Sequence, residues 1–252
     1  MTIEGTILSI FLILPVSYLA ACRVEPMDSV KQKTEKRSHW RLTARVHTEG
    51  IFNFGGRVGS VNPTGDINFT YDRKKWGFLF FKGQDFYDHT TFYNFALATV
   101  YKNFKPSPKL TITPSVGSFL EQANSVADRG SDIVFLLTTT FRINQQLSLE
   151  QMSLLGNLII EPTEHDWVNR LRLLYSHRHL DVTTSLWHNN SVFDNSSYWS
   201  CGLTIAYSRI KFGEHAYLST GVSGLLVLQT SDEAANPKKN ALMLTVGLQV
   251  FN

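Results

Sequence analysis

Three arginines in the second half of the chain are candidates for binding anions. Arg170 and Arg172 are separated by one residue, so their side chains share a face of an extended strand, and Arg142 lies on the polar face of its own alternating segment. A guanidinium group matches carboxylates and phosphates in shape. Glu150 and Asp181 are expected on the same inward faces. The alternative is therefore that the arginines pair with these carboxylates and fill a narrow interior.

A second group of residues has the types needed for nucleophilic catalysis. His188 could activate the hydroxyl of Ser191, and Asp194 or Asn195 could orient the imidazole. His188 and Ser191 are three residues apart, so a regular strand would point them to opposite faces, and a loop would be needed to bring them together. The simpler interpretation is a polar loop.

Composition limits the remaining functions. The chain of 252 residues is 43% hydrophobic and only 18% charged, with two cysteines and a net charge of +3. These values exclude a disulfide-stapled scaffold and a disordered chain, and they give little support to a nucleic-acid partner. No glycine-rich phosphate loop or metal-binding helix motif occurs, so we expect no cofactor and no metal.

The N-terminal residues resemble an export signal. The apolar run Ile7–Ala21 is shorter than the roughly 20 residues of a spanning helix and contains Pro15, as suits a signal peptide. It ends in Leu19-Ala20-Ala21-Cys22, which is similar to a bacterial lipobox, and that resemblance implies lipid attachment at Cys22. The alternative is ordinary signal cleavage with Cys22 incidental. We therefore divide the chain into a signal (1–22), a polar linker (23–39) and one domain (40–252).

From Trp40 onward, apolar residues recur with a period of two, which predicts strands. In Ala241–Asn252, for example, Leu242, Leu244, Val246, Leu248 and Val250 share one face. Twelve strands are expected, centred near residues 47, 68, 79, 97, 112, 138, 152, 171, 184, 204, 221 and 246. Longer loops are expected at 83–90, 122–132, 191–197 and 230–239.

Many alternating strands fit either a soluble sandwich or barrel, or a membrane barrel. The second is favoured because the less apolar faces carry Gly, Ala, Ser and Thr rather than Lys and Glu. Aromatic residues near strand ends also suggest interfacial girdles. They are Trp76, Tyr87, Phe92, Tyr93, Tyr101, Phe104, Trp167, Tyr175, Trp187, Tyr198 and Trp199.

With an export signal, repeated alternation and a final strand Thr245–Asn252 whose aromatic Phe251 is penultimate, the chain resembles Gram-negative outer-membrane β-barrels. The resemblance implies an all-β fold: a single antiparallel transmembrane barrel of about twelve strands in the outer membrane. We expect a narrow channel or a structural barrel, with membrane lipid and a small anionic solute as partners and the oligomeric state open.

Two barrel types carry the functional alternatives. A lumen that contains Arg142, Arg170 and Arg172 would resemble that of twelve-stranded channels for acidic oligosaccharides, which implies an anion-binding channel. Outer-membrane phospholipases and lipid A deacylases are similar to the His188 and Ser191 pair, which implies a lipid hydrolase instead. A secreted soluble β-sandwich that binds ligands is the third alternative.

Overall fold

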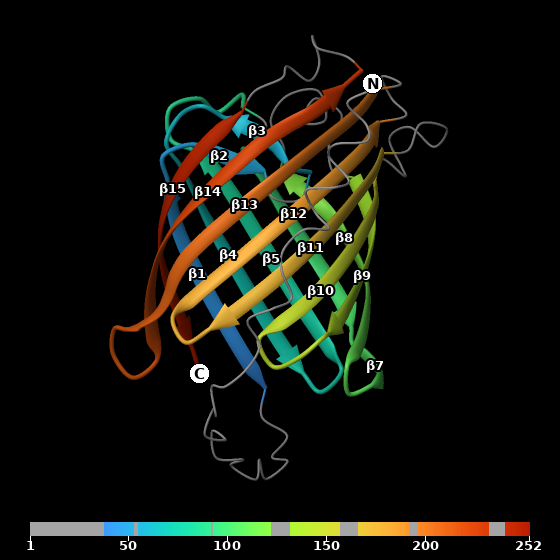
Figure 1. Ribbon diagram of the computed structural model, residues 1–252, viewed down its shortest axis with the longest axis vertical. Helices are drawn as coiled ribbons and strands as arrows, with labels where there is room; N and C mark the ends of the chain where they lie inside the picture. The colour runs from blue at the N-terminus through green and yellow to red at the C-terminus, as the bar shows by residue number, and fades with distance from the viewer. Residues whose placement is uncertain are drawn as a thin grey trace, which may run out of the picture. The chain divides into compact units, whose positions relative to one another are not determined.

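The computed structural model describes residues 38–52, 55–91, 93–121, 132–156, 166–191, 196–231 and 240–252. Twelve antiparallel strands form a closed ring, because the pairing of β6 with β8 joins the two ends of the sheet (Figure 1). The predicted all-β barrel is confirmed, and the soluble sandwich is wrong. Within the described residues, no helix is long and apolar enough to cross a membrane.

The ring strands follow one another in sequence order, except that a short hairpin and one short strand interrupt the series. The ring strands are β1 (His39–His47), β4 (Thr64–Arg73), β5 (Trp76–Asp85), β6 (Phe95–Lys102), β8 (Leu110–Glu121), β9 (Asp132–Arg142), β10 (Leu147–Gly156), β11 (Asp166–His177), β12 (Leu180–Ser191), β13 (Ser196–Lys211), β14 (Ala216–Thr230) and β15 (Ala241–Phe251). The short β7 (Phe104–Ser107) pairs with β8, and β2 (Gly50–Phe52) pairs with β3 (Arg57–Ser60).

All twelve predicted strands are present, with shifted boundaries. The first lies earlier than expected, since the alternation of Leu42 and Val46 extends back to His39. Residues 83–85, expected in a loop, complete β5 opposite Thr64–Asp66 of β4. The β2–β3 hairpin was not predicted from the sequence.

The two ends of the barrel differ in their connections. One end has the end of β15 and short turns. Examples are the two-residue turns that contain Lys74 and Arg178, whose φ angles are 58° and 51°. The other end has the long connections, including residues 48–63 and 86–94. Outer-membrane barrels have short periplasmic turns and longer external loops. We therefore call these the periplasmic end and the external end.

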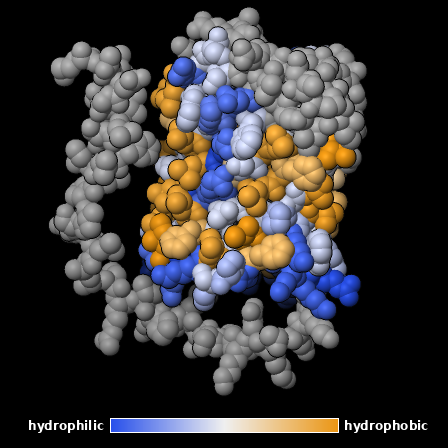
Figure 2. Space-filling model, turned by 90° about the vertical axis from the view of Figure 1, so that its right-hand side faces the viewer, coloured by the Kyte–Doolittle hydropathy of each residue, from blue (hydrophilic) through white to orange (hydrophobic). Residues whose placement is uncertain are grey.

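Aliphatic side chains cover the outer wall. Leu242, Leu244 and Val246 of β15 are 63, 52 and 57% exposed, values that suit contact with lipid rather than water. Figure 2 shows one outer wall, on which apolar patches flank a polar strip. The outer surface is thus mainly a lipid-facing band.

Aromatic side chains mark the two edges of this band, but the girdle is smaller than predicted. At the periplasmic end the ammonium of Lys102 lies over the rings of Trp76 and Phe104, at 5.1 and 5.0 Å. Trp167, Tyr175 and Trp199 also face outward by register. Tyr101, Trp187 and Tyr198 instead face inward. Tyr101 donates a hydrogen bond to the inward Asp72, Trp187 is opposite Arg170, and Tyr198 is opposite Asn189. Phe92 lies outside the described residues.

Candidate functional site: the barrel lumen

The β2–β3 hairpin lies inside the external half of the barrel (Figure 1). It leaves the wall between β1 and β4, and its tip reaches β12 and β13. There Asn189 Nδ2 donates a hydrogen bond to the carbonyl of Gly55 (2.5 Å), and Ser200 Oγ donates one to the carbonyl of Gly56 (2.7 Å). The guanidinium of Arg57 lies 5.2 Å from the Tyr198 ring centroid. The hairpin therefore spans part of the lumen and is fixed at both ends.

Apolar packing supports the hairpin. Ile51 is 3% exposed and packs with Trp187, Leu225 and Met243, which all face inward from β12, β14 and β15. Gly56, with φ +61°, lies against the Trp187 indole, where a Cβ would overlap the ring. This position requires glycine for both its backbone angle and the close approach.

The base of the hairpin is held by a buried carboxylate. Asp85, at the external end of β5, accepts hydrogen bonds from Ser60 Oγ and from Asn62 Nδ2 (3.2 Å) in the hairpin connection. It also accepts from the backbone N–H groups of Tyr87 and Asp88, at 2.8 and 2.9 Å. Asp85 thus joins the hairpin to the next external connection, and the fully buried carboxylate is satisfied by these donors.

The inner wall of the external half is apolar on the side opposite the hairpin tip. Phe81, Phe95, Leu97, Val134, Leu136, Met152 and Leu154 form one buried cluster there. The sequence predicted an inner face of small and polar residues, as observed along β13, where Ser200, Gly202 and Thr204 face inward. The cluster corrects this expectation for the external parts of β5, β6, β9 and β10, where its members face inward.

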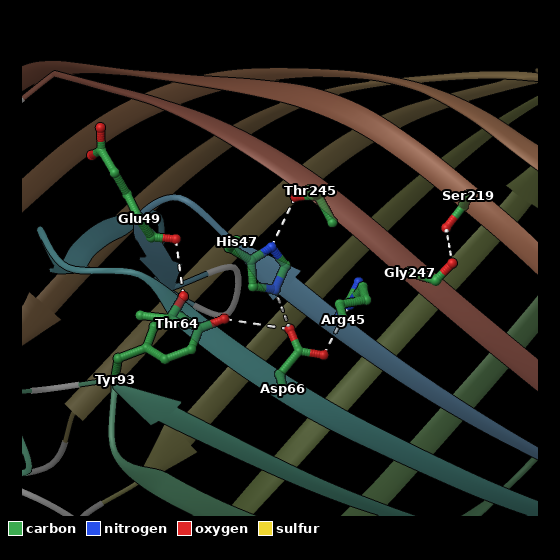
Figure 3. A network of polar contacts seen from close by, with 9 residues as sticks. All are labelled: Arg45, His47, Glu49, Thr64, Asp66, Tyr93, Ser219, Thr245 and Gly247. Carbon is green, nitrogen blue, oxygen red and sulfur yellow. Dashed lines mark hydrogen bonds and ion pairs between the residues drawn. The ribbon is translucent and has the colours of Figure 1, made fainter. Parts of the chain in front are cut away.

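A polar network crosses β15, β1 and β4 just below the hairpin (Figure 3). Asp66 is central: its Oδ1 accepts from Arg45 Nε and its Oδ2 lies 2.8 Å from His47 Nε2. His47 Nδ1 lies 2.8 Å from Thr245 Oγ1. The Asp66 side chain is 2% exposed, so its charge depends on these partners.

Tyr93 links this network to the hairpin. Its hydroxyl lies 3.3 Å from Asp66 Oδ2, and its ring contacts the backbone positions of Gly50 and Gly59. Burial raises the pKa of Tyr93, so the phenol remains protonated and can donate its hydrogen bond to the carboxylate.

The hydroxyl, imidazole and carboxylate of Thr245, His47 and Asp66 form a row that is also found in hydrolase triads. Here the imidazole is only 3% exposed and the carboxylate is shared with Arg45. The arrangement therefore fits a structural network better than a nucleophile open to substrate.

A second charged cluster lies across the lumen and contains two of the predicted arginines. Glu150 Oε1 accepts from Arg170 Nη2 at 3.1 Å and from Arg172 Nη2 at 2.6 Å. The Arg170 side chain is 8% exposed and that of Arg172 is 27% exposed. Arg172, the more exposed of the two guanidinium groups, therefore presents positive charge to the lumen.

The other predicted charges are at the periplasmic mouth. Arg142 is exposed there, at the end of β9. Asp181 pairs with Arg209 Nη1 at 3.0 Å and accepts from Ser176 and Ser208, so its ionic partner is not one of the three arginines expected from sequence. The structure thus brings Arg170 and Arg172 together with Glu150, while Arg142 lies apart.

Of the predicted hydrolytic residues, His188 is the one whose side chain the structure describes. His188 faces outward from β12, opposite Asn169, and its ring stacks on Trp199 with a centroid separation of 4.0 Å. The Ser191 side chain and Asp194 lie outside the described residues, as does Cys22 with the whole of the predicted export signal.

Three solved structures have similar folds. The "KdgM porin" aligns with a TM-score of 0.53 at 9% identity, covering 83% of this chain and 98% of that one. The "NanC porin" aligns at 0.54 and 8% identity, with the same coverage. The COG4313 outer membrane channel from Pseudomonas putida F1 aligns at 0.54 and 8% identity, covering 90% of this chain and all of that one.

The chain has the fold of an outer-membrane β-barrel. No protein-family model and no curated protein matches the sequence. The outer-membrane location expected from the sequence agrees with this barrel fold and with the apolar outer wall, whose aromatic edges suit the two membrane interfaces.

Sequence reasoning missed the residues that occupy the lumen of this barrel. The hairpin follows the first strand within a glycine-containing segment, Gly50–Ser60, which has only seven residues in strands. The alternation of polar residues Arg45, His47 and Asp66 with apolar neighbours was a usable signal for inward-facing charges on β1 and β4.

Proposed function

We propose that the protein is a narrow outer-membrane channel whose external half is restricted by the β2–β3 hairpin and whose lumen favours anions. The closed barrel supplies a route across the membrane, and the similar folds of solved porins and channels support this function. The hairpin, fixed at Gly55 and Gly56, reduces the width of that route.

The preference for anions rests on the side chains of the inner wall. Below the hairpin, arginines outnumber carboxylates among the described strand residues. The arginines are Arg41, Arg45, Arg142, Arg170, Arg172 and Arg209, and the carboxylates are Asp66, Asp72, Glu150 and Asp181. An excess of one sign in a low-dielectric channel raises the local concentration of the opposite ion. The observation that carries this proposal is Arg172, whose partly exposed guanidinium group faces the lumen beside Glu150.

Planar-bilayer recording tests the function. Purified protein is expected to give small single-channel current steps. In a gradient of potassium chloride, the reversal potential is expected to lie closer to the equilibrium potential of chloride than to that of potassium. Absence of steps would remove the channel, whereas steps with a cation-selective reversal potential would remove only the anion preference.

A further inference from the structure

A polar network lies on the outer wall of the barrel. Gln151 Nε2 donates to Ser153 Oγ at 2.7 Å, and Ser153 Oγ donates to Asn169 Oδ1 at 2.7 Å. Trp167 Nε1 also donates to Asn169 Oδ1, at 2.9 Å. These residues face outward, because their registers alternate with the inward Met152 and Arg170. Polar groups at such positions are costly in lipid and are commonly functional.

The network is confined to one side of the barrel. Ser153, Asn169, His188 and Trp199 are opposite one another on successive strands β10 to β13, so they form a row across the wall. The wall around β14 and β15 instead presents exposed aliphatic side chains, such as Val222, Leu226 and Leu244. The row therefore distinguishes this wall from the wall formed by β14 and β15.

A groove of about 280 Å³ adjoins the network. Its outward lining side chains are apolar except for Ser153, and they come from four neighbouring strands. They are Pro114, Phe135, Leu137, Ser153, Leu155 and Trp167. Phe135 and Trp167 are half exposed and lie near the external ends of their strands, at the level expected for the upper membrane interface.

We propose that this groove and polar row bind one lipopolysaccharide molecule, with an acyl chain in the groove and its amide, ester or hydroxyl groups on Asn169 and Gln151. The apolar lining of the groove suits a flexible acyl chain. The external end places the site in the outer leaflet.

Hydrogen-bonding capacity supports this occupant. In the network as the structure describes it, Asn169 uses its oxygen and Gln151 its nitrogen, which leaves the Asn169 N–H groups and the Gln151 oxygen for a ligand. A ligand with both acceptors and donors beside an acyl chain matches this pair. The site does not depend on conduction, so it stands or falls separately from the channel proposal.

Native mass spectrometry of the full-length protein in mild detergent tests the proposal, with rough-type lipopolysaccharide as the probe and phosphatidylethanolamine as the comparison. We expect retention of one lipopolysaccharide, weakened about tenfold by Asn169→Leu, because loss of a hydrogen bond or two has that effect. Thr220→Leu, which removes an outward hydroxyl on β14, is the matched control and should retain the lipid.

Folding of each variant is checked by heat-modifiable migration, and Gln151→Leu provides a second arm with the same expectation if Asn169→Leu does not fold. Equal retention by the variants and the wild type would overturn the proposal. Stronger retention of phosphatidylethanolamine than of lipopolysaccharide would also overturn it. A protein dimer found in place of the lipid adduct, and dissociated by Asn169→Leu, would overturn it as well.

Discussion

Gly56 at the hairpin tip lies directly against the indole ring of Trp187, and its carbonyl accepts a hydrogen bond from Ser200. A residue of the first external connection is thereby fixed to β12 and β13, across part of the lumen. This contact defines the narrow region in the proposed channel, and the first prediction follows from it.

Gly56→Ala is expected to displace the hairpin tip and raise single-channel conductance. An added Cβ would overlap Trp187, and the φ of +61° is unfavourable for alanine. Gly224→Ala is the control, since a Cβ there meets no atom within 4 Å. Conductance in planar bilayers is the measurement, and equal conductance in both variants would show that the tip does not restrict flow.

Glu150→Gln is expected to shift the reversal potential further toward the equilibrium potential of chloride. The change leaves Arg170 and Arg172 without their shared carboxylate, and Arg172 faces the lumen. Asp181→Asn is the comparison at the periplasmic mouth, where Arg209 is 39% exposed and solvent screens the charge, so a smaller shift is expected. An unchanged potential in Glu150→Gln would mean that ions do not pass this cluster.

Asp66→Asn is expected to destabilise the barrel by about 3 kcal/mol, since it leaves the partly buried charge of Arg45 and the buried His47 ring without their carboxylate partner. Asp72→Asn should cost only about 1 kcal/mol, because Asp72 accepts one hydrogen bond from Tyr101 in a half-buried site. Urea unfolding in lipid vesicles, followed by tryptophan fluorescence, measures both. Equal losses would contradict the central role of Asp66.

Tyr93→Phe is expected to lower stability by about 1 kcal/mol through loss of the hydrogen bond to Asp66. The ring contact with the hairpin at Gly50 and Gly59 is kept, so conductance should be unchanged. The same two assays distinguish these effects. A rise in conductance with unchanged stability would show that the hydroxyl holds the hairpin and does little for the wall.

The strands were predictable from sequence because every second side chain points toward lipid. The resulting alternation is strong in segments such as Ala241–Phe251. The interior was less predictable. Phe78–Phe81 is apolar on both faces, so parity alone could not show that Phe81 joins an inner cluster. Contacts of His47 with Asp66 and Thr245 depend on the register of three strands, which only the closed barrel fixes.

The central claim, a channel narrowed by its own first external hairpin, is tested most directly by removing that hairpin. Gly50 pairs with Ser60, so a two-residue turn can join Glu49 to Val61 without opening the barrel. Single-channel conductance of this shortened protein is expected to exceed that of the wild type, with folding verified by heat-modifiable migration. Identical conductance, or no conductance in either protein, would contradict the account.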